Sequence, residues 1–155
     1  MEDENRYFME EAIRLSMLQD KGGPFGAVIA RDGIIIGSGR NEVLANQDPT
    51  CHAEMMAIRH ACKSIGDFKL SGCVLYTSCE PCPMCWAAAG WANIKTIFYG
   101  CTRYDAASIG FDDEFLYDEL NQPLDNREIT MFLICRDEAK KAFESWNTNP
   151  NKSMY

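Results

Sequence analysis

The sequence predicts an α/β protein with three layers, α/β/α, around a mixed sheet of five strands. Two apolar segments early in the chain flank a tight-turn signal and indicate an antiparallel hairpin. Later strand-like segments alternate with helical ones, as in a sheet that is covered on both faces. The chain has 155 residues, of which 46% are hydrophobic and 25% are charged, a composition typical of one soluble domain spanning residues 1–155.

The first part of the chain supplies one helix and the hairpin. Apolar residues from Phe8 to Met17 recur at helical spacing, and Gly-Gly-Pro at residues 22–24 ends that helix. Residues 25–30 and 34–39 are predicted strands. The Arg-Asp-Gly segment between them favours a tight turn, so the two strands are antiparallel.

A polar loop follows the hairpin over residues 41–49. Thr50 is expected to cap a helix that runs to about Ile65, where Gly66 ends it. The other predicted elements are strands at residues 73–77, 96–99 and 129–135 and helices at about residues 83–92, 111–120 and 139–146. Open α/β sheets bind ligands beyond the carboxyl ends of their strands, so the loops that leave the third and fourth predicted strands are expected to hold the site.

Acidic residues outnumber basic ones. Asp and Glu total 23 and Lys and Arg total 15, which gives a net charge of −8 and a pI of about 4.7. This charge repels phosphate, so we expect neither a nucleic acid nor an anionic membrane as partner, whereas a small neutral substrate is compatible with it. No apolar run has the length of a membrane span, and the first residues lack the features of a signal peptide, so a cytoplasmic protein is expected. Eight cysteines in a reducing compartment are metal ligands or buried thiols rather than disulfides.

Two short segments carry residues suited to metal and proton chemistry. They are residues 51–54 (Cys-His-Ala-Glu) and residues 79–85 (Cys-Glu-Pro-Cys-Pro-Met-Cys). A Cys-x-x-Cys pair at the start of a helix points both sulfurs to one side, and the helix dipole there favours thiolates. Thiolates and an imidazole suit Zn²⁺. We therefore expect two helix N-termini to face each other across a zinc ion held by His52, Cys82 and Cys85.

Three protein ligands leave the fourth zinc position for water, whose pKa the metal lowers to roughly 7. Glu54 lies two residues after His52 and can lean past the helix end toward the same place, as a general base and acid. The alternative is a closed structural site with Cys79 as the fourth ligand and no chemistry. Glu54 favours the catalytic interpretation, because a structural site has no use for a carboxylate there. Cys79 is also expected at the end of a strand, before the helix begins.

These motifs resemble the signature of the zinc nucleobase deaminases, His-x-Glu followed by Pro-Cys-x-x-Cys. Within that family the chain is most similar to the small bacterial guanine deaminases, and the similarity covers nearly its whole length. The segments that carry it are residues 22–29, 48–50, 75–85, 105–107 and 110–113 and Tyr155. Two features depart from the family: Trp86 is bulkier, and residues 87–90 are smaller, than expected, and both bear on a pocket wall or a subunit contact.

The resemblance implies a cytidine deaminase-like fold with one zinc per subunit and the hydrolysis of guanine to xanthine and ammonia in purine catabolism. In that reaction zinc hydroxide attacks C2 of guanine, while Glu54 carries the proton of water to N3 and helps ammonia leave. Asp113 is the implied second carboxylate, which assists proton transfer or holds the amine.

The resemblance also implies substrate contacts and an assembly. The implied contacts to the purine come from Phe25, Asn41, Ala53, Trp91 and Tyr155. The implied assembly is a homodimer in which the C-terminal segment, about residues 136–155, crosses to the partner subunit, so that each site is shared between two chains.

Several of these residues have a simpler structural interpretation. Asn41 suits a turn, Phe25 a core position, Asp113 a solvated acidic surface and Tyr155 a frayed chain end. The activity has alternatives as well. One is another small substrate, such as guanosine or cytosine; a second is adenosine in tRNA, which the negative charge disfavours; a third is a zinc-stabilised module without activity.

Overall fold

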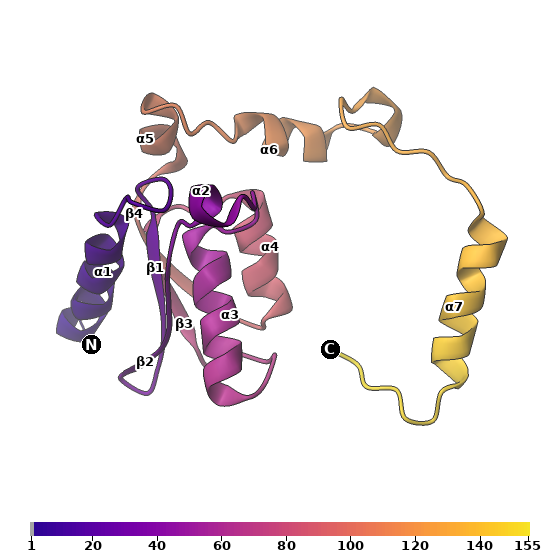
Figure 1. Cartoon of the computed structure of the whole chain (residues 1–155), viewed down its shortest axis with the longest axis horizontal. Coiled ribbons are helices and arrows are strands. Elements are labelled where there is room, and N and C mark those ends of the chain that lie inside the picture. The colour runs from indigo at the N-terminus through magenta and orange to yellow at the C-terminus, as the bar shows by residue number, and fades with distance from the viewer. Residues whose placement is uncertain (1) are drawn as a thin grey trace. The chain divides into compact units, whose positions relative to one another are not determined.

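The computed structural model describes residues 2–155. The chain forms two compact units that divide between Asp113 and Glu114, and each is described by itself (Figure 1). Over these residues, none of the helices has both the length and the apolar character that a membrane crossing requires.

The first unit contains a sheet of four strands. Its elements are α1 (Glu2–Ser16), β1 (Gly26–Arg31), β2 (Ile34–Arg40), α2 (Val43–Asn46), α3 (Ala53–Ile65), β3 (Val74–Cys79), α4 (Pro83–Trp91), β4 (Thr96–Cys101) and α5 (Arg103–Ser108). The strand order is β2-β1-β3-β4. β1 is antiparallel to both β2 and β3, and β3 is parallel to β4, so the sheet is mixed as predicted.

The predicted hairpin is confirmed. Arg31 pairs with Ile34, and the two residues between them, Asp32 and Gly33, have φ of 52° and 78°. Positive φ at both central positions is the geometry of the turn that matches the twist of adjacent strands, and an Asp-Gly pair adopts it readily.

Two apolar clusters cover opposite faces of the sheet. The cluster that joins α1 to the sheet contains Phe8, Ala12, Val28, Ala30 and Tyr76. The cluster that joins α3 and α4 to the other face includes Ala27, Ile29, Ala53, Ala57, Ala61, Leu75 and Ala89. Alternate residues of β1 point to opposite faces, as a strand requires. The first unit therefore has the predicted three layers, which Figure 1 shows as α1, the sheet, and α3 with α4.

Small residues bring α3 unusually close to β2. Ala53, Ala57 and Ala61 are four residues apart, lie on one side of the helix and are fully buried. They face Gly37 and Gly39 of β2: a Cβ on Gly37 would lie 2.5 Å from the Ala57 carbonyl oxygen, and one on Gly39 would lie 2.6 Å from the Ala57 nitrogen. This contact fixes the depth of α3 on the sheet and with it the position of the residues at the start of α3.

Substitution of Gly39 by alanine is expected to destabilise the fold by about 1–3 kcal/mol, the usual range for overpacking a tight contact. The added methyl meets the backbone of α3, which cannot move aside as a flexible side chain can. Urea unfolding measures the difference in the free energy of unfolding. Gly90→Ala on α4 is the matched control, because a Cβ there meets nothing within 4 Å and alanine favours a helix. An unchanged free energy for Gly39→Ala would contradict the close contact.

The sequence misplaced some boundaries and missed two short helices. α3 begins at Ala53 with His52 as its N-cap, so Thr50 is not the cap. Gly66 does end the helix, with φ of 68°. α2 and α5 were not predicted; they have four and six residues, too few to show a periodic apolar face.

The second unit comprises α6 (Glu114–Asn121), a 3₁₀ turn (Leu124–Asn126) and α7 (Arg136–Thr148). All of residues 114–155 are described, and none of them is buried. The predicted fifth strand at residues 129–135 is wrong for this chain: the segment is irregular and its apolar side chains are exposed. A strand needs a hydrogen-bonded neighbour, and this unit contains no other strand for the segment to pair with.

Candidate metal centre and active site

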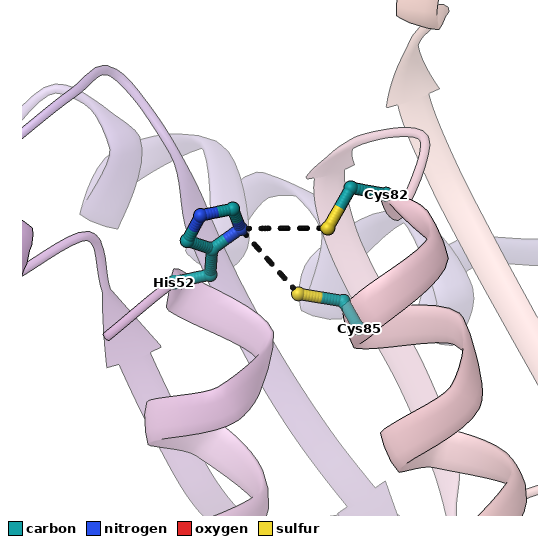
Figure 2. Close-up of side chains that lie close together, drawn as sticks. All are labelled: His52, Cys82 and Cys85. Atoms are coloured by element: carbon teal, nitrogen blue, oxygen red, sulfur yellow. Dashed lines mark hydrogen bonds between the residues drawn. The ribbon is translucent and has the colours of Figure 1, made fainter. Parts of the chain in front are cut away.

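One imidazole and two thiols meet at the starts of two helices. The Nδ1 atom of His52 lies 3.6 Å from the Sγ atom of Cys82 and 3.6 Å from the Sγ atom of Cys85. All three ligand atoms lie within 4.8 Å of one another. Figure 2 shows the three side chains converging from α3 and α4 on one point. This is the arrangement that the sequence predicted.

The helix starts explain the convergence. His52 is the N-cap of α3 and Cys82 is the N-cap of α4, while Cys85 lies in the first turn of α4. Pro83 occupies the first turn of α4, where a missing N–H costs no helical hydrogen bond. Both N-termini bring unpaired N–H groups and the positive end of a helix dipole to the cluster, which stabilises thiolates.

Hydrogen bonds within the cluster shift the pKa values of its two thiols in opposite directions. Hydrogen bonds from Cys85 and His52 lower the pKa of Cys82 to about 4, while donation to Cys82 and burial raise the pKa of Cys85. The hydrogen bond to Cys82 also raises the pKa of His52.

The donor set fits zinc. Tetrahedral ligands at about 2.0 Å for nitrogen and 2.3 Å for sulfur lie roughly 3.5 Å apart, close to the 3.6 Å found here. Two sulfurs and one imidazole nitrogen also match the ligand preference of that ion. Among the residues that the structure describes, the cluster has three members, which is the ligand number of a catalytic rather than a closed structural zinc site.

Cys79 stands apart from the cluster. It is the last residue of β3, as expected, and its thiol points to the carbonyl oxygen of Thr102 at 3.5 Å. Burial raises the pKa of Cys79 to about 12, so this thiol stays protonated at neutral pH. A protonated thiol that is already hydrogen-bonded elsewhere is not a ligand, and the arrangement disfavours the closed four-ligand alternative.

Glu54 lies beside the cluster in the first turn of α3. Its side chain is buried, and its Oε1 atom accepts a hydrogen bond from the Thr77 hydroxyl at 3.1 Å. Burial raises the pKa of Glu54, and the nearby Cys82 charge raises it further. A carboxyl group with a raised pKa accepts and returns a proton more readily near neutral pH, which suits a general base and acid.

Asp113 lies within electrostatic reach of the same cluster. Burial raises the pKa of Asp113, and the charge of Cys82 adds to this effect. The charge of Asp113 in turn raises the pKa of His52. The side chain of Asp113 is half-buried.

Phe25 directly precedes β1, Asn41 directly follows β2, and Ala53 is the first residue of α3. Asn41 is buried, and its Oδ1 atom accepts hydrogen bonds from the N–H groups of Gly23 and Val43, both at 3.2 Å. The backbone N–H of Asn41 donates to the carbonyl oxygen of Phe25 at 3.0 Å. Asn41 thus holds a turn, as its structural interpretation predicts, and the same bonds fix the orientation of its amide.

Two expected substrate contacts are not brought to the cluster within the first unit. Trp91 is the last residue of α4, about 9 Å along the helix from Cys85, and its side chain is 69% exposed. Tyr155 belongs to the second unit and is also exposed.

A cavity of about 530 Å³ lies at the carboxyl ends of β3 and β4, beside α1. Its lining includes Phe25, Ser78, Cys79, Gly100 and Cys101. None of the metal ligands lines it, whereas Ile13 and Ser16 of α1 do, and α1 covers the opposite face of the sheet from α3 and α4. Its place at these strand ends agrees with the location expected from the sequence.

Sequence reasoning missed three residues that position the site. Thr77 orients Glu54, Glu80 accepts a hydrogen bond from the backbone N–H of Arg103, and Phe111 packs on Phe25. No local pattern singles them out, because each acts on a residue far away in the sequence.

Comparison with known proteins identifies the family. Residues 2–101 match the model of the cytidine and deoxycytidylate deaminase zinc-binding region. This chain belongs to that deaminase family. The match covers the sheet and every member of the metal cluster, so the deaminase binds zinc through His52, Cys82 and Cys85.

Relatives of this deaminase are known in sequence and structure. It is 49% identical to the guanine deaminase of Bacillus subtilis over 134 residues, 86% of each protein. It is 34% identical to the tRNA-specific adenosine deaminase of Haemophilus influenzae over 88% of this chain and 77% of that protein. The crystal structure of the Bacillus subtilis guanine deaminase superposes with a TM-score of 0.93 and 45% identity, over 97% of this chain and 98% of that one.

Proposed function

We propose that this deaminase hydrolyses guanine to xanthine and ammonia. The observation that carries the proposal is the similarity to the Bacillus subtilis guanine deaminase, at 45% identity over 97% of this chain. The superposition with a tRNA:A34 deaminase covers 63% of this chain, with a TM-score of 0.61. The net charge of −8 further disfavours an RNA substrate.

The residues of the site suit this reaction. Glu54 takes a proton from the attacking water and delivers it to N3 of the purine, which makes C2 a better electrophile. The same carboxylate then takes the proton of the hydroxyl newly bound to C2 and passes it to the exocyclic amine, so that the C2–N bond breaks, the C2 carbonyl of xanthine forms and ammonia leaves. The hydroxyl of Thr77 keeps Glu54 turned toward the cluster. A zinc ion held by three protein ligands would supply a nucleophile at neutral pH, since it lowers the pKa of bound water to near 7.

The other residues of the site bind and orient the purine. Phe25 offers a ring face to the purine, and Asn41, whose Oδ1 atom is already engaged, offers its amide group as a donor. Ala53, at the start of α3, leaves room for the flat base. Asp113 assists proton transfer to the departing amine or holds that amine.

Among small substrates, guanine is expected to release ammonia far faster than guanosine, cytosine or adenine. A site shaped for one flat base does not have room for a ribose in the same orientation. Steady-state ammonia release with the zinc-loaded full chain measures kcat/KM for each substrate. Guanosine turned over as fast as guanine would contradict the substrate assignment and leave the zinc chemistry in place.

We propose further that the deaminase is a cytoplasmic homodimer in which residues 136–155 of one copy reach the site of the other and bring Tyr155 over the substrate. Support comes from apolar side chains that this part of the chain exposes, including Phe143, Trp146 and Met154. Sedimentation at assay concentration is expected to give the mass of a dimer. A monomeric mass together with full activity would contradict the shared site.

A further inference from the structure

We infer that Phe111 is a positioning residue, whose ring packs against Phe25 and Gly23 and thereby sets the loop of residues 109–113 so that Asp113 faces the metal cluster. The inference rests on the proposed function for the part that Asp113 takes in the reaction. It concerns a residue that touches neither the metal ligands nor the reacting atoms, and that acts through its neighbours.

The loop starts from a fixed helix end. After α5 the backbone N–H of Gly110 donates to the carbonyl oxygen of Ala107 at 3.0 Å, and that of Phe111 donates to Ala106 at 3.0 Å. Gly110 has a φ of 97°, a conformation that L side chains rarely adopt. These bonds reverse the chain direction and aim the Phe111 side chain back over the unit.

The start of α5 is tied to the loop that carries the metal ligands. Thr102 caps the helix in a reciprocal arrangement with Asp105. The backbone N–H of Arg103 donates to a carboxylate oxygen of Glu80 at 3.0 Å, and the backbone N–H of Glu80 donates to the carbonyl oxygen of Cys101 at 2.8 Å. Glu80 precedes Cys82 by two residues, so α5 is anchored beside the cluster at its first residue.

The Phe111 ring closes the far side of the loop. Its centroid lies 5.0 Å from that of Phe25, and the two ring planes meet at 89°, which is the edge-to-face geometry that aromatic pairs prefer. A Cβ on Gly23 would lie 3.0 Å from the Phe111 ring and 3.1 Å from the Phe25 ring. The two rings reach this distance because the residue beneath them is glycine.

The exposure of the Phe111 side chain indicates that its contact with Phe25 holds the loop of residues 109–113 in place and adds little to the core. Phe111 is 47% exposed and belongs to neither apolar cluster of the sheet. The ring therefore gains only part of the burial energy of a core phenylalanine. It lies two residues before Asp113, whose carboxylate interacts electrostatically with Cys82 and His52. Loss of the ring releases the segment that holds this carboxylate.

A double-mutant cycle in the zinc-loaded full chain tests the inference. We expect Phe111→Ala to lower kcat for guanine by about tenfold or more, because small displacements of a catalytic group are costly. In the Asp113→Asn background the same substitution is expected to change kcat by less than about threefold, since the residue to be positioned is gone. Phe111→Tyr keeps the ring edge and is expected to restore most of the rate.

Phe68→Ala is the matched control. Phe68 is 48% exposed and lies between α3 and β3, before the amino end of the strand whose carboxyl end carries the site. Its substitution removes the same ring and is expected to leave kcat unchanged. Zinc content and melting temperature, measured for every variant, separate loss of positioning from loss of fold. An unchanged kcat for Phe111→Ala, or an effect that multiplies with that of Asp113→Asn, would overturn the inference.

A readout independent of turnover separates this inference from the proposed function. Hydrogen exchange of the amides of Gly110 and Phe111, both hydrogen-bonded to α5, is expected to accelerate at least about tenfold in Phe111→Ala and to stay unchanged in Phe68→Ala. If wild-type protein releases no ammonia from guanine, the substrate assignment fails and the exchange result still decides the inference. Equal protection in wild type and Phe111→Ala would overturn it.

Discussion

Replacement of Glu54 by glutamine is expected to lower kcat for guanine by on the order of 10²–10⁴-fold, the range that general acid–base catalysis contributes. The amide has almost the same volume as the carboxyl group and can still accept the hydrogen bond from Thr77. It cannot take a proton from water or return one to the purine. Zinc content and fold are therefore expected to match the wild type, because Glu54 is not among the three clustered ligands.

Steady-state ammonia release measures the effect on kcat, and metal analysis of the same preparation measures bound zinc. Glu10→Gln on α1 makes the same chemical change at an exposed position and is expected to keep full activity. Substantial turnover by zinc-loaded Glu54→Gln would remove this residue from the proton-transfer role. Loss of zinc from Glu54→Gln would instead make it a ligand.

Replacement of Cys85 by alanine is expected to weaken zinc binding by more than about 100-fold, since even the loss of a group behind a ligand costs 10–100-fold. Activity is expected to disappear with the metal. The melting temperature in the presence of zinc is expected to fall as well, because zinc that binds only the folded state stabilises the folded state. Dialysis against a metal-buffered solution followed by metal analysis measures the affinity.

Cys79→Ala is the matched control for this substitution. Both residues are buried cysteines, but the Cys79 thiol points to Thr102 and lies outside the cluster. The variant is expected to keep one zinc per chain. A closed structural site predicts the opposite, namely loss of zinc from Cys79→Ala together with no turnover by the wild type.

The metal centre could be predicted from sequence because its determinants are local. The Cys82-Pro83-Met84-Cys85 segment specifies two sulfurs at a helix start, and His52 followed by an amphipathic run specifies a second helix start. Only the close approach of the two helix N-termini depends on residues that are far apart in the sequence. It follows from the parallel crossover that places both helices on one face of the sheet.

The parts that could not be predicted depend on partners distant in the sequence. The segment at residues 129–135 has the composition of a strand, but a strand also needs a neighbour, which its own unit does not contain. The position of Asp113 depends on Phe111, Gly23 and Phe25, which are related only in three dimensions.

The contact of Gly37 and Gly39 with the alanines of α3 has a consequence for how such an enzyme can diversify. His52 and Glu54 share a helix whose backbone touches the backbone of the neighbouring strand, with no side chain between them to rearrange. The metal ligand His52 and the proton carrier Glu54 are therefore held rigidly relative to each other. A larger residue at the contact between α3 and β2 would displace both. Changes at the contact between Phe25 and Phe111, whose rings pack edge to face on partly exposed segments, leave His52 and Glu54 where they are and so offer a less costly route to new specificities.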